Sequence, residues 1–222
     1  MIYLKTLIGQ GASRFCYLHP QDKQKCVKVP KNSQALKDIR REIMINTLLQ
    51  PVLGDCISSC EKDIIATDKG PGMVCELIRN YDGTVSLPIK RANRTADKGY
   101  DVHSLEPSMN LFFEKIIEND IFFFDFNFGN FVFQFTAPQK LKLVYTDVKS
   151  LNVNGYLGFL KLDKFISPLA RIIMFRRIRR FYRELGLAFP FKELCRRKMF
   201  SNFWVPFSPN LKLWEHENRK HI

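Results

Sequence analysis

Short apolar runs separated by turn residues dominate the first 80 residues of the chain. Runs of this length and composition predict strands, because a strand needs only a few apolar residues to cover one face of a sheet. They lie at residues 3–8, 15–18, 25–29, 63–67 and 73–78. Residues 9–13 and 68–72 are rich in glycine and predict turns. The pattern therefore predicts a meander of three strands and, later, a hairpin of two.

A helical repeat separates these two groups of strands. Asn32 and Ser33 offer an N-cap, and apolar residues then recur at helical spacing to about Leu49. Pro51 follows and predicts the end of the helix, because proline cannot donate the backbone hydrogen bond of a helix interior. The expected order is three strands, one helix and two strands.

The second part of the chain follows a polar and basic stretch at residues 81–100, which predicts a linker. Beyond it the pattern predicts a helix at 107–119, a hairpin at 130–135 and 141–146, and a helix at 168–185. We therefore expect an α+β protein with two units. Residues 1–79 would form a five-stranded antiparallel unit with one helix, and residues 80–222 an abbreviated, mainly helical unit.

Charge is distributed unevenly along the 222 residues, whose formal net charge is +13. The last predicted helix carries a basic cluster at Arg176, Arg177, Arg179 and Arg180. Such a cluster favours an anionic partner, either a membrane surface or a phosphate-rich substrate, and we consider nucleic acid an unlikely partner. The alternative is a solvated basic face on a helix whose apolar side packs on the protein.

The cysteines and the N-terminus indicate a cytoplasmic protein. The six cysteines form no pair of CxxC motifs, so reduced thiols in a reducing compartment are the expectation. Residues 1–5 lack the basic and apolar regions of a signal peptide. We expect a cytoplasmic location, with peripheral contact at the inner membrane face as a further option.

Candidate chemistry lies in a phenylalanine-rich segment that contains Asp125 and Asn130 and is followed by Asp147. A buried carboxylate needs a cation or strong hydrogen bonds, because its desolvation is costly. In kinases an Asp that accepts the acceptor's proton is followed five residues later by an Mg²⁺-binding Asn, and then by a second metal-binding Asp. The spacing predicts Asp125 as catalytic base, with Asn130 and Asp147 as metal ligands. The alternative is three residues that cap backbone amides.

Three further features appear in kinase order before this segment. Gly9 and Gly11 would allow backbone amides to approach a polyphosphate, although a plain hairpin turn explains them as well. Lys28, in an apolar strand, would bind the α- and β-phosphates, and Glu42, on the helix, would hold Lys28. A solvated lysine and a surface glutamate are the alternatives.

A family resemblance rests on five pieces of sequence. They are Gly9-Gln10-Gly11, Cys16-Tyr17-x-His19-Pro20, Cys26-Val27-Lys28-Val29, Lys37-x-Ile39-Arg40-Arg41-Glu42 and Asn130-Phe131-Val132. With these the chain resembles, over about residues 9–194, the YrbL family of PhoP-regulated bacterial proteins, small members of the protein-kinase-like superfamily. The resemblance implies a two-lobe kinase-like fold with ATP and Mg²⁺ between the lobes. It also implies a hinge near residues 75–79, so that Cys75 and Leu77 would contact the nucleotide.

Several positions depart from the kinase pattern. Arg14 stands where the third glycine of the loop would be, and Asn127 replaces the lysine two residues after the catalytic Asp. Val148 and Lys149 follow Asp147 in place of Phe-Gly. We expect a kinase that transfers the γ-phosphoryl group of ATP to an unidentified acceptor. The alternative is an inactive nucleotide-binding pseudokinase or a regulatory interaction protein.

Overall fold

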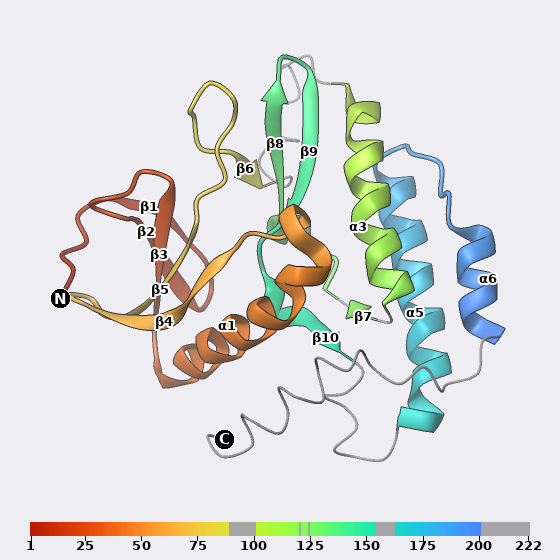
Figure 1. Cartoon of the computed structure of the whole chain (residues 1–222), viewed down its shortest axis with the longest axis horizontal. Helices are drawn as coiled ribbons and strands as arrows, with labels where there is room; N and C mark the ends of the chain where they lie inside the picture. The colour runs from red at the N-terminus through yellow and green to blue at the C-terminus, as the bar shows by residue number, and fades with distance from the viewer. Residues whose placement is uncertain (89–100, 120, 124, 154–162, 201–222) are drawn as a thin grey trace.

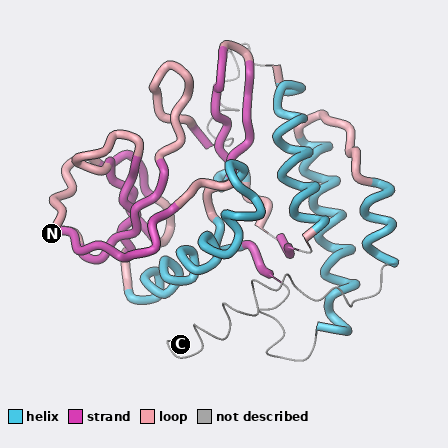
Figure 2. Tube along the Cα trace, viewed as in Figure 1, coloured by secondary structure: helices cyan, strands magenta, loops and turns pink. Residues whose placement is uncertain are grey.

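The computed structural model describes residues 1–88, 101–119, 121–123, 125–153 and 163–200. A sheet built from the first part of the chain lies on one side, and helices α3, α5 and α6 lie on the other (Figure 1). Helix α1 crosses the space between them (Figures 1 and 2). None of the helices within these ranges is both long and apolar enough to cross a lipid bilayer.

The first sheet has five antiparallel strands in the order β1-β2-β3-β5-β4. They are β1 (Leu7–Gln10), β2 (Arg14–Leu18), β3 (Lys25–Pro30), β4 (Cys60–Thr67) and β5 (Gly70–Glu76). In the central strand β3, Lys28 lies opposite Cys16 of β2 and Met73 of β5. Directly paired residues point to the same face of a sheet, so these three side chains share a face.

Helix α1 (Ser33–Leu53) begins at Asn32, whose side chain accepts a hydrogen bond of 2.9 Å from the Ala35 amide. The prediction that it stops before Pro51 is wrong: it continues to Leu53 and is capped by Gly54, at φ 56°. Leu49 and Leu53 are buried on either side of the proline. Their burial favours the extra turn and outweighs the hydrogen bond that proline cannot make.

The same helix contributes to two hydrophobic cores. Ile39 and Ile43 pack with Met73 under the first sheet. Further along, Leu49 and Leu53 belong to the large core of the second part of the chain. Helix α1 therefore packs against both parts.

The buried Asn46 fixes α1 to the sheet. Its side-chain amide donates a 2.8 Å hydrogen bond to the Ser58 carbonyl, and its oxygen accepts one of 3.2 Å from the Cys60 amide. These bonds satisfy two backbone groups where β4 begins. The same two hydrogen bonds fix the position of the preceding turn of α1, and that turn carries Glu42.

The second part of the chain is mainly helical. Its helices are α3 (Glu106–Glu118), α5 (Asp163–Glu184) and α6 (Lys192–Phe200). Its strands are β6 (Leu87–Pro88), β7 (Ile121–Phe123), β8 (Phe131–Ala137), β9 (Lys140–Tyr145) and β10 (Leu151–Val153). Short 3-10 helices lie at η3 (Val102–Leu105), η4 (Phe128–Asn130) and η5 (Val148–Ser150), and a further one, η1 (Gly54–Cys56), follows α1 in the first part. The strands form a β6-β8-β9 sheet and a separate β7–β10 pair.

Aromatic side chains fill the core of this second part. Phe131 lies 4.8 Å from Phe181 and 4.9 Å from Tyr145, measured between ring centroids. Phe112 of α3 lies 6.1 Å from Phe131, so a helix and two strands meet on the same rings. Such ring pairs hold the β8–β9 hairpin against the helices.

The predicted α+β class is confirmed, with a five-stranded antiparallel sheet and one helix ahead of a mainly helical remainder. Several boundaries differ. The first strand is Leu7–Gln10 instead of residues 3–8, so Gly9 lies in a strand and not in a turn. Within the predicted linker, residues 81–86 form turns and an isolated bridge, residues 87–88 form β6, and residues 89–100 lie outside the described residues. Helix α5 begins at Asp163 and not at residue 168. The division at residue 79 stays a prediction.

We expect Gly72→Ala to destabilise the protein. A Cβ at Gly72 would lie 2.6 Å from Cγ1 of Val27, and the neighbouring atoms leave it little room. Val27 is 0% exposed and has no room to move aside. The overpacking should therefore lower the free energy of unfolding by about 1–3 kcal/mol, as measured by urea unfolding.

The matched control is Gly9→Ala in the same sheet, where a Cβ would meet no atom within 4 Å. Equal stability losses for the two variants would contradict the close approach of β5 to Val27.

Candidate functional site

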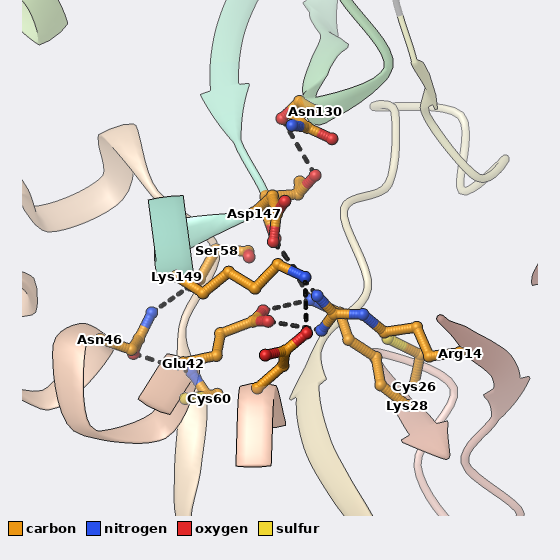
Figure 3. Close-up of polar contacts among 12 residues, drawn as sticks. Arg14, Cys26, Lys28, Glu42, Asn46, Ser58, Cys60, Asn130, Asp147 and Lys149 are labelled. Carbon is orange, nitrogen blue, oxygen red and sulfur yellow. Dashed lines mark hydrogen bonds and ion pairs between the residues drawn. The ribbon is translucent and has the colours of Figure 1, made fainter. Parts of the chain in front are cut away.

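Glu42 is the centre of a buried group of charges. Only 3% of its side chain is exposed, and its Oε1 lies 2.8 Å from the Lys28 amine. Its other oxygen, Oε2, pairs with the Arg14 guanidinium. Arg14 also reaches Asp147, with 3.1 Å between Nη2 and Oδ1. We call these four residues, Arg14, Lys28, Glu42 and Asp147, the ion-pair cluster (Figure 3).

Local structure explains why these side chains meet. Lys28 and Cys16 are direct partners in the β2–β3 ladder, so they share a face of the sheet. Arg14 lies two residues before Cys16 in the same strand and therefore points to the same face. Helix α1 packs under that face and brings Glu42 to the two cations.

The charges in the cluster support one another. Burial alone would raise the pKa of Glu42, but the neighbouring Lys28 and Arg14 outweigh burial and lower that pKa below its usual value. Burial alone would lower the pKa of Lys28, yet the neighbouring Glu42 carboxylate acts in the opposite direction, and the pKa of Lys28 lies above its usual value. Glu42 and Lys28 are therefore both ionised at neutral pH.

Asp147 follows strand β9 and completes the cluster. The carbonyl oxygen of the preceding residue, Thr146, accepts a 3.2 Å hydrogen bond from the Lys28 amine. Burial and repulsion from Glu42 raise the pKa of Asp147, although Lys149, Arg14 and Lys28 act in the opposite direction. The Asp147 carboxylate is thus a group that gains from a nearby cation.

Asp125 and Asn130 join the cluster through Thr146. The Asn130 side-chain amide donates a 2.8 Å hydrogen bond to Oδ2 of Asp125. The Asn130 carbonyl accepts one of 2.8 Å from the Thr146 amide, next to Asp147. Asp125 also accepts a bond of 3.1 Å from the Asn127 amide, so it does cap the loop, as the alternative interpretation expected. A continuous path of contacts nevertheless connects Asp125 to Lys28.

Backbone conformation does not explain why glycine stands at positions 9 and 11. Neither has a positive φ, and a Cβ at either position would meet no atom within 4 Å. The fold therefore tolerates other residues at both positions. The Gly11 amide donates a 2.9 Å hydrogen bond to the Arg14 carbonyl, which closes the turn between β1 and β2. A need for glycine would have to come from a ligand that approaches this turn.

Cys75 and Leu77 lie at the end of β5. Both side chains are buried in the core that also contains Ile39 and Ile43. Burial raises the pKa of the Cys75 thiol to about 12. Cys75 lies opposite Cys26 of β3, and Cys26 stands two residues before Lys28 in that strand. The backbone of β5 at Cys75 therefore passes near the ion-pair cluster.

The residues available for a metal ion are few. Among the described residues, no group of three or more His, Cys, Asp and Glu side chains is placed to hold one. The predicted pair consists of one carboxylate, Asp147, and one carboxamide, Asn130. Mg²⁺ commonly binds through one or two carboxylates together with substrate phosphates. This donor set therefore fits an ion that binds together with a nucleotide.

Arg14 was not predicted as a site residue. The sequence marked it only as a departure from the glycine pattern, yet it contacts two members of the cluster. The strand pattern could have identified it. Arg14 lies two residues before Cys16, which pairs with Lys28, so Arg14 and Lys28 lie on the same face of the sheet.

The basic cluster of α5 is exposed, as Arg176, Arg177, Arg179 and Arg180 all face solvent. The opposite side of the helix is buried through Ile178 and Phe181. This is the amphipathic packing that the alternative interpretation expected. An anionic partner for the exposed arginines stays a prediction.

Comparisons with known proteins identify relatives. The family described as "PhoP regulatory network protein YrbL" matches residues 2–186. The YrbL proteins of Escherichia coli (strain K12) and Shigella flexneri are each 33% identical over 85 residues, 37% of this chain. Those matches span 40% of the length of each relative. A crystallised kinase domain superimposes on 68% of this chain and 51% of its own, with a TM-score of 0.49 and 10% identity.

We expect Glu42→Gln to destabilise the protein at neutral pH by about 3–5 kcal/mol, because it leaves two buried cations without their shared carboxylate. Since the pKa of Glu42 is lowered in the folded state, its stabilising contribution is present above the ordinary pKa of 4.5 and is lost as pH falls through the folded value. Urea unfolding at pH 7 and pH 3 should show a smaller difference from the wild type at pH 3.

Glu61→Gln is the matched control, because Glu61 pairs with Lys25 at 2.9 Å on the surface. It should change stability little at either pH. A Glu42→Gln effect that does not depend on pH would contradict the ionised state of Glu42.

Proposed function

This chain belongs to the family of the PhoP regulatory network protein YrbL, and from the geometry of its ion-pair cluster we propose that it is a kinase. It would transfer the γ-phosphoryl group of ATP, with Mg²⁺, to a hydroxyl group of an acceptor. The observation that carries the proposal is the partly buried Lys28, whose amine lies 2.8 Å from Glu42 and 3.2 Å from the carbonyl oxygen of Thr146, the residue before Asp147.

Lys28 would bind the nucleotide phosphates. A lysine with 14% of its side chain exposed keeps one side open while Glu42 fixes its position. Phosphoryl transfer depends mainly on positioning and charge neutralisation, so a rigid ammonium group is effective there. The low exposure of the pair strengthens its field, because less water screens it.

Asp147 and Asn130 would supply oxygen ligands for Mg²⁺. The ion, when bound, neutralises charge on the phosphate oxygens during transfer. The backbone bond between Thr146 and the Asn130 carbonyl keeps the two residues at the same end of the β8–β9 hairpin. The hairpin therefore holds these two candidate ligands in a fixed relation to each other.

Asp125 would accept the proton of the acceptor hydroxyl. Its two oxygens each accept a hydrogen bond, from Asn130 and from Asn127, and these bonds orient the carboxylate. An oriented carboxylate needs to lie within hydrogen-bond distance of the hydroxyl that it activates.

A second function, nucleotide binding without transfer, has two observations in its favour. Asp147 is paired with Arg14, and the loop that follows Asp125 carries Asn127 in place of a lysine. Both features reduce resemblance to an active kinase. Such a protein would use the same residues to sense ATP.

The test is to measure Mg²⁺-dependent ATP binding and ADP formation with the purified chain, where water takes the place of the acceptor hydroxyl and phosphate is released. We expect Asp125→Asn to retain ATP binding and to lower turnover about 10²–10⁴-fold, because it removes the proton acceptor. Asp147→Asn should abolish the Mg²⁺ dependence of binding. Calorimetric titration and a coupled ADP assay provide the two measurements.

The control is Asp55→Asn, an exposed aspartate paired with Lys142 at 2.6 Å, which should behave as the wild type. Binding of ATP without ADP formation in any variant, the wild type included, would favour the sensing function. Absence of ATP binding by the wild type would reject both functions.

We also expect Gly11→Ala to unfold at the same urea concentration as the wild type, because the added Cβ meets no protein atom within 4 Å. Its ATP affinity should fall by roughly tenfold, the equivalent of ~1.4 kcal/mol, because the methyl group would keep phosphates from the turn. Unchanged affinity would show that the turn at Gly11 does not approach the nucleotide.

A further inference from the structure

Arg14 occupies an unusual position for an arginine. Its side chain is only 15% exposed, and it connects Glu42 of α1 to Asp147, the candidate metal ligand. Two different nitrogens make the two contacts, Nη1 to Glu42 and Nη2 to Asp147. Loss of the Asp147 contact would therefore leave the Glu42 contact in place.

The cluster is neutral as it stands, with two cations, Arg14 and Lys28, and two carboxylates, Glu42 and Asp147. A metal ion at Asp147 competes with Arg14 for the same carboxylate. Once the metal ion displaces Arg14 from Asp147, the Nη2 group of Arg14 would be partly buried without an anion beside it. Leaving a partly buried cation without its partner costs free energy. A phosphate oxygen brought by the nucleotide is a suitable replacement, because guanidinium groups bind phosphate strongly.

The chain also lacks one of the cations that a kinase uses. Asn127 stands where the loop lysine would act on the transferred phosphoryl group, so position 127 supplies no positive charge. Arg14 lies on the same face of the sheet as Lys28, the other candidate phosphate ligand. It is therefore placed to supply that charge from the opposite side.

We propose that Arg14 is a phosphate-binding residue that exchanges partners: it pairs with Asp147 in the free protein and with a nucleotide phosphate when Mg²⁺ takes Asp147. Glu42 keeps the guanidinium in position during the exchange. This inference rests on the proposed binding of Mg²⁺ and ATP, and it assigns to the chain a cation that the kinase pattern does not contain.

The experiment is a set of calorimetric titrations with two separate ligands, a non-hydrolysable ATP analogue and AMP. Each ligand is titrated once with Mg²⁺ and once without it. The proteins are the wild type, Arg14→Gln, Arg14→Lys, Asp147→Asn and the double variant. Arg196→Gln is the matched control, because it removes an exposed arginine that pairs only loosely with Glu193, at 3.4 Å. Urea unfolding of each variant monitors the fold.

With Mg²⁺, Arg14→Gln should weaken binding of the ATP analogue by roughly tenfold or more and leave AMP binding almost unchanged. Arg14→Lys should restore part of the affinity. Without Mg²⁺, Asp147→Asn should bind the analogue more tightly than the wild type, because Arg14 no longer has a competing carboxylate. The double variant should lose that gain.

A purely structural role for Arg14 predicts equal losses for AMP and the ATP analogue, and that result would overturn the inference. Tighter binding by Arg14→Gln with Mg²⁺ would also overturn it, since Arg14 would then only block the metal. If the wild type binds the analogue with Mg²⁺ and Arg14→Gln binds it equally well, the inference fails while the proposed function stands. If the wild type binds no nucleotide, both fail.

Discussion

The burial of one carboxylate, Glu42, between two cations is the constraint on which the rest of the site depends. A charge with 3% exposure is stable only when its partners are fixed, because desolvation of a lone carboxylate is costly. Lys28 comes from β3 and Arg14 from β2, so the pairing determines where α1 lies against the sheet. The hydrogen bonds of Asn46, one turn later in α1, fix the same helix to β4.

The same pairing explains how residues of the second part come close to the sheet. Lys28 reaches the Thr146 carbonyl and Arg14 reaches Asp147, so the end of β9 is attached to both cations. Lys149 adds a third link, with 3.5 Å between its amine and Asp38 of α1. Two of these three contacts are ion pairs, and the four residues of the ion-pair cluster together carry no net charge. The polyphosphate of the proposed function would therefore require added positive charge, which the proposed Mg²⁺ would supply.

Much of this arrangement could be predicted from the sequence, because the informative features were local. The spacing of Asp125 and Asn130, the position of Asp147 after a strand, and Lys28 in an apolar strand each depend on short segments. The role of Arg14 could not be predicted in this way. Its partners lie 28 and 133 residues away, and only the completed fold shows that they meet. The three-residue strands β7 and β10 escaped prediction because so few residues carry no periodic pattern.

The extension of α1 past Pro51 shows the same limit. Local propensity favours a stop there, whereas Leu53, which is 0% exposed, requires another turn to reach the second core. Packing decided the outcome, and packing between distant segments is not visible in a single window of sequence.

The attachment of α1 to two cores also restricts how the proposed kinase activity could be regulated. Many kinases are controlled by an outward swing of the helix that carries the glutamate. Here such a swing would pull Ile39 and Ile43 from one core and Leu49 and Leu53 from the other, at about 1.5–3 kcal/mol for each fully exposed side chain. Control of the proposed kinase activity through side chains or flanking loops would avoid this cost, because the helix would stay docked.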